Sequence, residues 1–287
     1  MSFSHEVKEE LSKLINYKDK QILKAEFLGY ILTANSNQKE NGIEFVTENE
    51  FNIEAFYKIL FNLDIEYDPC TKGKFYLASI PFSSKIEECL ELVTSTDENI
   101  LKTIVKGAFL GAGSLNEPEK KYHLEISFQN EKNANHILNI CKYFYINLKL
   151  LESKNKYILY LKESEEISKF LALIGANKAV LKFEEIRIMR EMKNNVNRLV
   201  NCETANINKT VNAAVDQIND IKFIQKMNKF EELSEELRKI ALLRLENPDA
   251  TLKELGTMLD EPLGKSGVNH RLKKIHNFAE ELKNNIL

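Results

Sequence analysis

Two short segments of the chain resemble each other, and this duplication limits the folds that the chain can adopt. Residues 29–36 read GYILTANS and residues 107–114 read GAFLGAGS. Identical residues occur at a constant offset of 78 positions: Gly29 and Gly107, Leu32 and Leu110, Ala34 and Ala112, Ser36 and Ser114. A constant offset between similar segments indicates that one structural unit occurs twice.

Each copy continues with an alternating, strand-like run and then with apolar residues at helical spacing. The helical faces consist of Ile53, Phe56, Leu60 and Leu63 in the first copy, and of Ile137, Ile140, Cys141 and Phe144 in the second. Further strand-like runs follow at residues 74–80 and 156–162. We therefore expect an α+β domain over residues 1–190, built from two pseudo-symmetric repeats at about 20–98 and 99–185, each reading helix, strands, helix, strand.

The stretch from residue 183 to residue 217 is rich in Asn, Arg and Lys and contains no Gly or Pro. This composition predicts one or two helices, and residues 191–221 are interpreted as a helical linker. Asn201, Asn206, Asn208 and Lys209 are expected to act in local caps and turns, because Asn side chains readily bond to nearby backbone. The alternative is a role in fixing the orientation of the two domains.

Residues 222–287 predict a separate all-α domain with the spacing of a helix-turn-helix. Helical segments at 230–247, 251–260 and 265–282 are separated by turns that carry Pro248, Pro262 and Gly264. Thr251 and Glu254 form a predicted capping box, and Ser266 is expected to cap the last helix. The predicted core consists of Leu252, Leu255, Leu259, Val268, Leu272 and Ile275, packed on Ile240, Leu243 and Leu245.

The last helix is predicted to bind double-stranded DNA. No acidic residue occurs between Pro262 and Ala279. Lys and Arg neutralise phosphates, whereas Asn and Arg bond to base edges, so Asn269 and Arg271 are the expected base readers. The full candidate set is Lys265, Ser266, Asn269, His270, Arg271, Lys273 and Lys274. The alternative is a merely solvated basic face, but the turn spacing, caps and absence of acids favour DNA.

A second basic stretch comprises Arg187, Arg190, Lys193 and Arg198. It predicts either a second DNA contact or ordinary surface charges on the linking helix, with equal weight. The net charge of −3 neither supports nor excludes DNA binding, because only local charge matters for such a surface.

The duplicated motif resembles the LAGLIDADG homing endonucleases, in which paired motif helices pack through small residues and end in metal-binding acids. The residues that correspond to the small residues of this contact are Gly29, Ala34, Gly107, Gly111, Ala112 and Gly113. Ala34 and Ala112 stand where that family has its metal-binding Asp. Alanine offers no ligand oxygen for a divalent metal, so we expect no nuclease activity and assign no catalytic residue.

With the opening SFSHEVKEEL, the segment from Asn197 to Ala214 and the terminal helix-turn-helix, the chain resembles the WhiA family over essentially its full length. That resemblance implies a bacterial DNA-binding transcriptional regulator of cell division, chromosome segregation and, in some bacteria, sporulation, located in the cytoplasm at the nucleoid. Two alternatives remain. One is an active endonuclease that uses displaced carboxylates such as Glu26 or Glu117; the other is a scaffold that binds a partner regulatory protein or a ligand.

The sequence predicts no cofactor, no metal site and no membrane partner. The cysteines at positions 70, 89, 141 and 202 are scattered, without the close spacing of zinc ligands. The N-terminus is charged from its start, unlike a secretory leader, and no apolar stretch approaches the roughly 18 residues of a membrane span.

Overall fold

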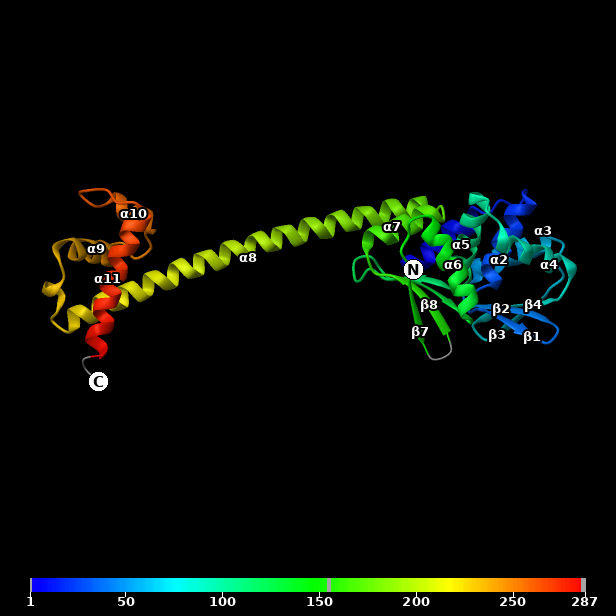
Figure 1. The fold of residues 1–287 in the computed structure, drawn as a ribbon, viewed down its shortest axis with the longest axis horizontal. Helices are drawn as coiled ribbons and strands as arrows, with labels where there is room; N and C mark the ends of the chain where they lie inside the picture. The colour runs from blue at the N-terminus through cyan, green and yellow to red at the C-terminus, as the bar shows by residue number, and fades with distance from the viewer. Residues whose placement is uncertain (1, 154–155, 285–287) are drawn as a thin grey trace. The chain divides into compact units, whose positions relative to one another are not determined.

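The computed structural model describes residues 2–153 and 156–284, which form two compact units, Met1–Met192 and Lys193–Leu287. The first unit is α+β and contains the expected duplication (Figure 1). The first copy consists of α2 (Lys20–Ile31), β1 (Ser36–Lys39), β2 (Gly42–Thr47), α3 (Glu50–Asn62), β3 (Asp68–Lys72) and β4 (Phe75–Pro81). The second copy consists of α5 (Glu98–Ala112), β5 (Gly113–Leu115), β6 (Leu124–Phe128), α6 (Glu131–Tyr143), β7 (Lys149–Ser153) and β8 (Lys156–Leu161).

The remaining elements of this unit precede the first copy, follow it, or follow the second copy. They are α1 (Phe3–Lys13), α4 (Ser84–Leu90), a 3-10 helix at Glu91–Thr94, α7 (Ser164–Leu173) and the start of α8 (Asn177–Lys226). Each copy has one strand more than we predicted, since β3 and β7 were missed. All residues of these two strands are exposed, so neither carries the alternation that marks a half-buried strand.

The two copies form antiparallel four-stranded sheets with the same strand order, β1-β2-β4-β3 and β5-β6-β8-β7. Phe45 lies opposite Ala78 in the first sheet, and Ile126 lies opposite Leu159 in the second, all fully buried. One face of each sheet therefore belongs to the core. The predicted helical faces are also confirmed, because Ile53, Phe56, Ile137 and Cys141 are buried, although Phe144 is only partly buried.

The motif helices α2 and α5 pack against each other with their backbones in contact. A Cβ atom added at Gly29 would lie 2.3 Å from the carbonyl oxygen of Ile104, and one added at Gly107 would lie 2.3 Å from that of Glu26. Only glycine allows such an approach. The role that the LAGLIDADG resemblance gave to these two residues therefore fits the observed packing.

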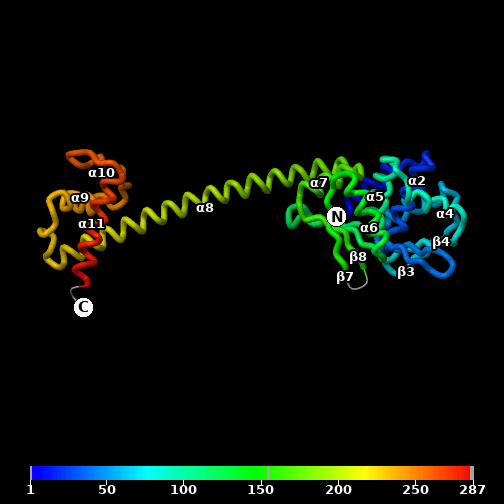
Figure 2. The backbone as a smooth tube through the Cα atoms, viewed as in Figure 1, coloured from blue at the N-terminus to red at the C-terminus, as the bar shows by residue number. Residues whose placement is uncertain are grey.

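The second unit is all-helical. It contains the rest of α8, a 3-10 helix at Phe230–Glu232, α9 (Glu235–Glu246), α10 (Leu252–Thr257) and α11 (Lys265–Asn284). Helices α9, α10 and α11 pack together near the end of α8 (Figure 2), and Ile221 and Ile224 from the last turns of α8 join the same core. Leu255, Val268 and Leu272 are buried there, as predicted.

Two local predictions about the helices are wrong. Helix α11 begins at Lys265, so Ser266 lies inside its first turn and is not the cap. The segment with Asn201, Asn206 and Asn208 lies within α8, which continues from Asn177 to Lys226, so these residues neither cap a helix nor form turns. By contrast, the Thr251–Glu254 capping box is confirmed, with both of its hydrogen bonds present.

Candidate nucleic-acid interface

Gly256 sets the turn between α10 and α11. Its carbonyl oxygen accepts a hydrogen bond from the amide of Leu263 at 3.0 Å. A Cβ atom added at Gly256 would lie 2.0 Å from the carbonyl oxygen of Leu263, so the two backbones approach too closely for any other residue. This contact fixes where α11 starts relative to α10.

Arg244, on α9, organises the preceding turn and was not singled out by sequence reasoning. Its side chain is 2% exposed, and its Nη1 donates to the carbonyl oxygens of Ala250 at 2.7 Å and Pro248 at 3.3 Å. Burial lowers the pKa of this guanidinium. Arg244 thus ties α9 to the chain that enters α10 through these two hydrogen bonds.

One face of α11 is buried, and the predicted DNA-contacting residues lie mostly on the rest of its surface. Val268, Leu272, Ile275 and Ala279 contribute the buried face. Among the predicted residues, those exposed to solvent are Lys265, Ser266, Asn269, His270, Lys273 and Lys274. The helix therefore exposes cationic and amide side chains to solvent, without an acidic side chain of its own before Glu280.

Arg271 differs from the other candidates. Its Nη2 lies 3.0 Å from Glu236 Oε2 on α9, and its side chain is 23% exposed. Because Glu236 is 70% exposed, this ion pair is a weak one that a phosphate or a guanine edge could replace. His276, on the same helix, is exposed as well, and its Nδ1 lies 2.6 Å from Asp220 Oδ2 on α8.

The second basic stretch is divided between paired and exposed side chains. Arg187 Nη2 lies 2.8 Å from Glu184 Oε2. Arg190 donates to the carbonyl oxygens of Pro118 and Lys120 and lies over the Tyr122 ring, 4.4 Å from its centroid.

The other two members of that stretch behave differently. Lys193 and Arg198 are exposed on α8, and neither forms an ion pair within the described part of the chain. Only these two offer charges that are not already used within the protein.

The ends of the two motif helices carry no carboxylate at the matching positions. Ala34 donates its amide to the carbonyl oxygen of Ser127 at 2.8 Å, and Asn35 Nδ2 donates to the carbonyl oxygen of Gly111 at 2.7 Å. Protein backbone and an amide side chain therefore occupy this region. An aliphatic or amide group there could not hold a divalent ion in the way that paired carboxylates do.

Both carboxylates that we considered as displaced replacements are engaged elsewhere. Glu26 is fully buried, with Oε2 2.8 Å from Lys106 Nζ. Burial raises the pKa of Glu26 to about 7, although the Lys106 charge opposes the shift. Glu117 Oε1 accepts the amide of Phe3 at 2.8 Å. Neither side chain is available at the motif ends.

The outward faces of the two sheets, opposite their core faces, carry nearly balanced charge. The cross-strand register places on them four lysines and three acids: Lys39, Lys72, Lys149, Lys156, Glu44, Asp68 and Glu125. Lys39 pairs with Glu44 at 3.4 Å. This near-neutral surface lacks the concentrated positive charge that phosphate binding requires.

Two further findings limit what the described residues can do. Within residues 2–153 and 156–284, the only cluster of three His, Cys, Asp or Glu side chains at metal-binding distance is Asp220, His276 and Glu280. None of the described helices is both long and apolar enough to cross a membrane.

The chain is similar to known proteins over both units. Residues 20–100 and 101–193 match the model of the WhiA LAGLIDADG-like domain, and residues 196–279 match that of the WhiA C-terminal HTH domain. The probable cell division protein WhiA of Clostridium acetobutylicum is 39% identical over 99% of each chain. That of Clostridium botulinum (strain Hall) is 40% identical over 100% of each. The crystal structure of full-length DUF199/WhiA from Thermatoga maritima matches with a TM-score of 0.64 and 29% identity, covering 98% of this chain and 99% of that one.

Proposed function

The chain belongs to the WhiA family, and from this premise we propose that it binds double-stranded DNA through α11 as a regulator of cell division. The observation that carries the proposal is the exposed face of α11, with Lys265, Lys273 and Lys274 for phosphates and Asn269 for a base edge. Arg271 joins Asn269 as a base reader once DNA replaces its contact with Glu236.

The finer role follows from the family resemblance. We propose that the protein regulates transcription at the nucleoid in the cytoplasm, with effects on chromosome segregation and, in some bacteria, sporulation, and that it works with a partner regulatory protein. The candidates for a second DNA contact on α8 are reduced to Lys193 and Arg198, because Arg187 and Arg190 already have partners within the protein.

The test of the DNA interface is the salt dependence of binding to duplex DNA, measured by fluorescence anisotropy. Each lost phosphate contact should reduce the slope of log K against log salt by about 1, so Lys273→Ala and Lys274→Ala should each lower it by that amount. Lys239→Ala is the matched control, since this lysine lies on α9 and pairs with Asp260 and Glu235. Unchanged slopes in both α11 variants would refute the interface.

We further propose that the LAGLIDADG-like unit has no nuclease activity. The support is Ala34 and Ala112 at the motif positions, together with the internal partners of Glu26 and Glu117. Incubation of the full chain with supercoiled plasmid and Mg²⁺ or Mn²⁺ should leave the plasmid intact under conditions in which an active homing endonuclease cuts it. Nicking that persists in Glu26→Gln and Glu117→Gln variants would point to contamination, whereas nicking lost in either would revive the endonuclease alternative.

A further inference from the structure

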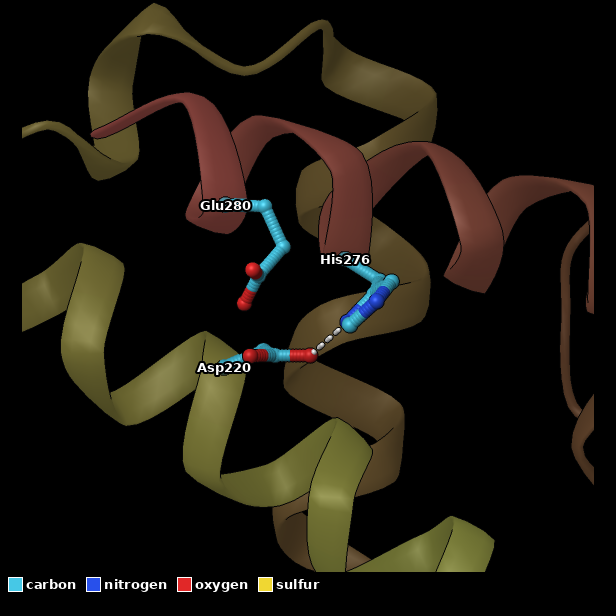
Figure 3. A group of neighbouring side chains, drawn as sticks. All are labelled: Asp220, His276 and Glu280. Atoms are coloured by element: carbon cyan, nitrogen blue, oxygen red, sulfur yellow. Dashed lines mark hydrogen bonds and ion pairs between the residues drawn. The ribbon is translucent and has the colours of Figure 1, made fainter. Parts of the chain in front are cut away.

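Three side chains that can bind metals converge where α11 packs on the end of α8. Asp220 belongs to α8, while His276 and Glu280 lie one turn apart on α11 (Figure 3). One ligand atom from each lies within 4.8 Å of the other two. Residues at i and i+4 of a helix project from the same face, so α11 presents its imidazole and carboxylate together toward Asp220.

Asp220 is the buried member of this cluster. Its side chain is 8% exposed, whereas that of His276 is 53% exposed. A carboxylate is costly to bury without a positive partner. Here His276 Nδ1 lies 2.6 Å from Asp220 Oδ2, at hydrogen-bonding distance.

A cation already lies among these groups. Lys283 Nζ is 3.2 Å from Asp220 Oδ1 and 2.7 Å from Glu280 Oε1. Its side chain is 43% exposed, so the ammonium can move into solvent without breaking the core. The carboxylates of Asp220 and Glu280 thus bind a positive charge. The Lys283 ammonium occupies this position and is able to leave it.

We propose that Asp220, His276 and Glu280 bind a zinc ion, which takes the place of the Asp220–His276 hydrogen bond, with its proton released to solvent, and displaces the Lys283 ammonium. An imidazole with two carboxylates is a donor set that zinc accepts, and water completes the four-coordinate shell. Mg²⁺ favours oxygen ligands and retains its own waters, so it competes poorly for a site with an imidazole. The ion would join α8 to α11 within the all-helical unit.

The test measures zinc bound to the full chain by equilibrium dialysis and calorimetry, in millimolar Mg²⁺ and after removal of metal with a chelator. We expect one zinc ion per chain. Loss of a direct ligand should weaken binding by at least about 100-fold, so His276→Ala and the exposed Glu280→Gln should both lose the ion. Lys283→Gln should tighten binding by about five- to tenfold, because a competing positive charge is removed.

The matched control is His270→Ala, which removes the other exposed histidine of α11. This variant should keep the zinc affinity of the unaltered chain. Helical circular dichroism of each variant reports whether the fold is intact, and Glu280→Gln guards against a folding defect in His276→Ala. Zinc binding that survives in both ligand variants, or that is lost in His270→Ala, would overturn the site. An unchanged affinity in Lys283→Gln would overturn the displacement of the ammonium.

Discussion

Glu26 is the one fully buried acidic side chain among the described residues of the α+β unit. It is fully buried on α2, and Lys106 on α5 provides the nearest cation at 2.8 Å. Neither oxygen of Glu26 has a hydrogen bond of good geometry among the described groups. Burial therefore outweighs the attraction of Lys106, which is why the pKa of Glu26 rises to about 7 instead of falling.

This raised pKa predicts that the α+β unit loses stability as pH rises from about 4.5 to about 7. The unfolded chain releases the Glu26 proton near its ordinary pKa of 4.5, whereas the folded protein retains it up to about 7. The contribution is fully present below pH 4.5 and is lost across this window, a change of about 3 kcal/mol. Glu26→Gln should remove it.

The measurement is urea unfolding of both proteins at several pH values, followed by tyrosine fluorescence. All 10 tyrosines lie between Tyr17 and Tyr160 and the chain has no Trp, so this emission reports the α+β unit alone. The difference in unfolding free energy between the two proteins should change across the window. Parallel pH profiles would contradict the assignment of a buried, protonated Glu26.

The sequence predicts the exposure of single side chains where it depends only on the residues of the same helix. The exposure of Lys273, Lys274 and Asn269 follows from the spacing of the apolar residues on α11. The partners of Arg271 and His276 could not be found this way, because Glu236 and Asp220 lie on other helices and meet them only after packing.

At the scale of elements, the contact between α2 and α5 depends on two glycines. In Gly107→Ala, the new methyl group would meet the carbonyl oxygen of Glu26 at 2.3 Å and the Cα of Gly29 at 3.0 Å. Both are backbone atoms of a packed helix, so the helices must separate. We expect a loss of about 3 kcal/mol in the stability of the α+β unit, at the upper end of the range for overpacked cores.

Gly111→Ala provides the matched control on the same helix. Its methyl group would meet the Thr33 side chain, with Oγ1 at 2.8 Å, and a side chain can move more easily than a backbone. Denaturant unfolding followed by tyrosine fluorescence should therefore rank Gly107→Ala as the more destabilised variant. Equal stabilities, or the reverse order, would show that backbone contact does not limit this interface.

The elements that sequence reasoning found are those with a buried face. Strands β2, β4, β6 and β8 and helices α3 and α6 each contain buried positions at the expected period. Strands β3 and β7 have no buried positions. They join β4 and β8 through backbone pairing, which leaves no pattern in the sequence. The fold of the repeat was thus predictable, but not its edge strands.

At the scale of the whole molecule, the proposed DNA interface depends on the exposed lysines of α11, namely Lys265, Lys273 and Lys274. The net charge of the chain is −3, so DNA binding must depend on a local surface. The outward sheet faces are close to neutral, with Lys39 already paired to Glu44. If α11 carries the interface, the α+β unit should add little to the affinity.

A reciprocal pair of charge reversals tests this distribution in the full chain. Lys273→Glu with Lys274→Glu should abolish salt-dependent binding to duplex DNA of mixed sequence, because it places two acids where phosphates must approach. Lys72→Glu with Lys149→Glu, both on outward sheet faces, should leave the affinity within about twofold, because exposed charges outside the proposed α11 contact are largely screened by salt. Anisotropy titrations at two salt concentrations measure both. Binding that survives the first pair of charge reversals and fails in the second pair would place the DNA contact on the sheets and would leave α11 without the role proposed for it.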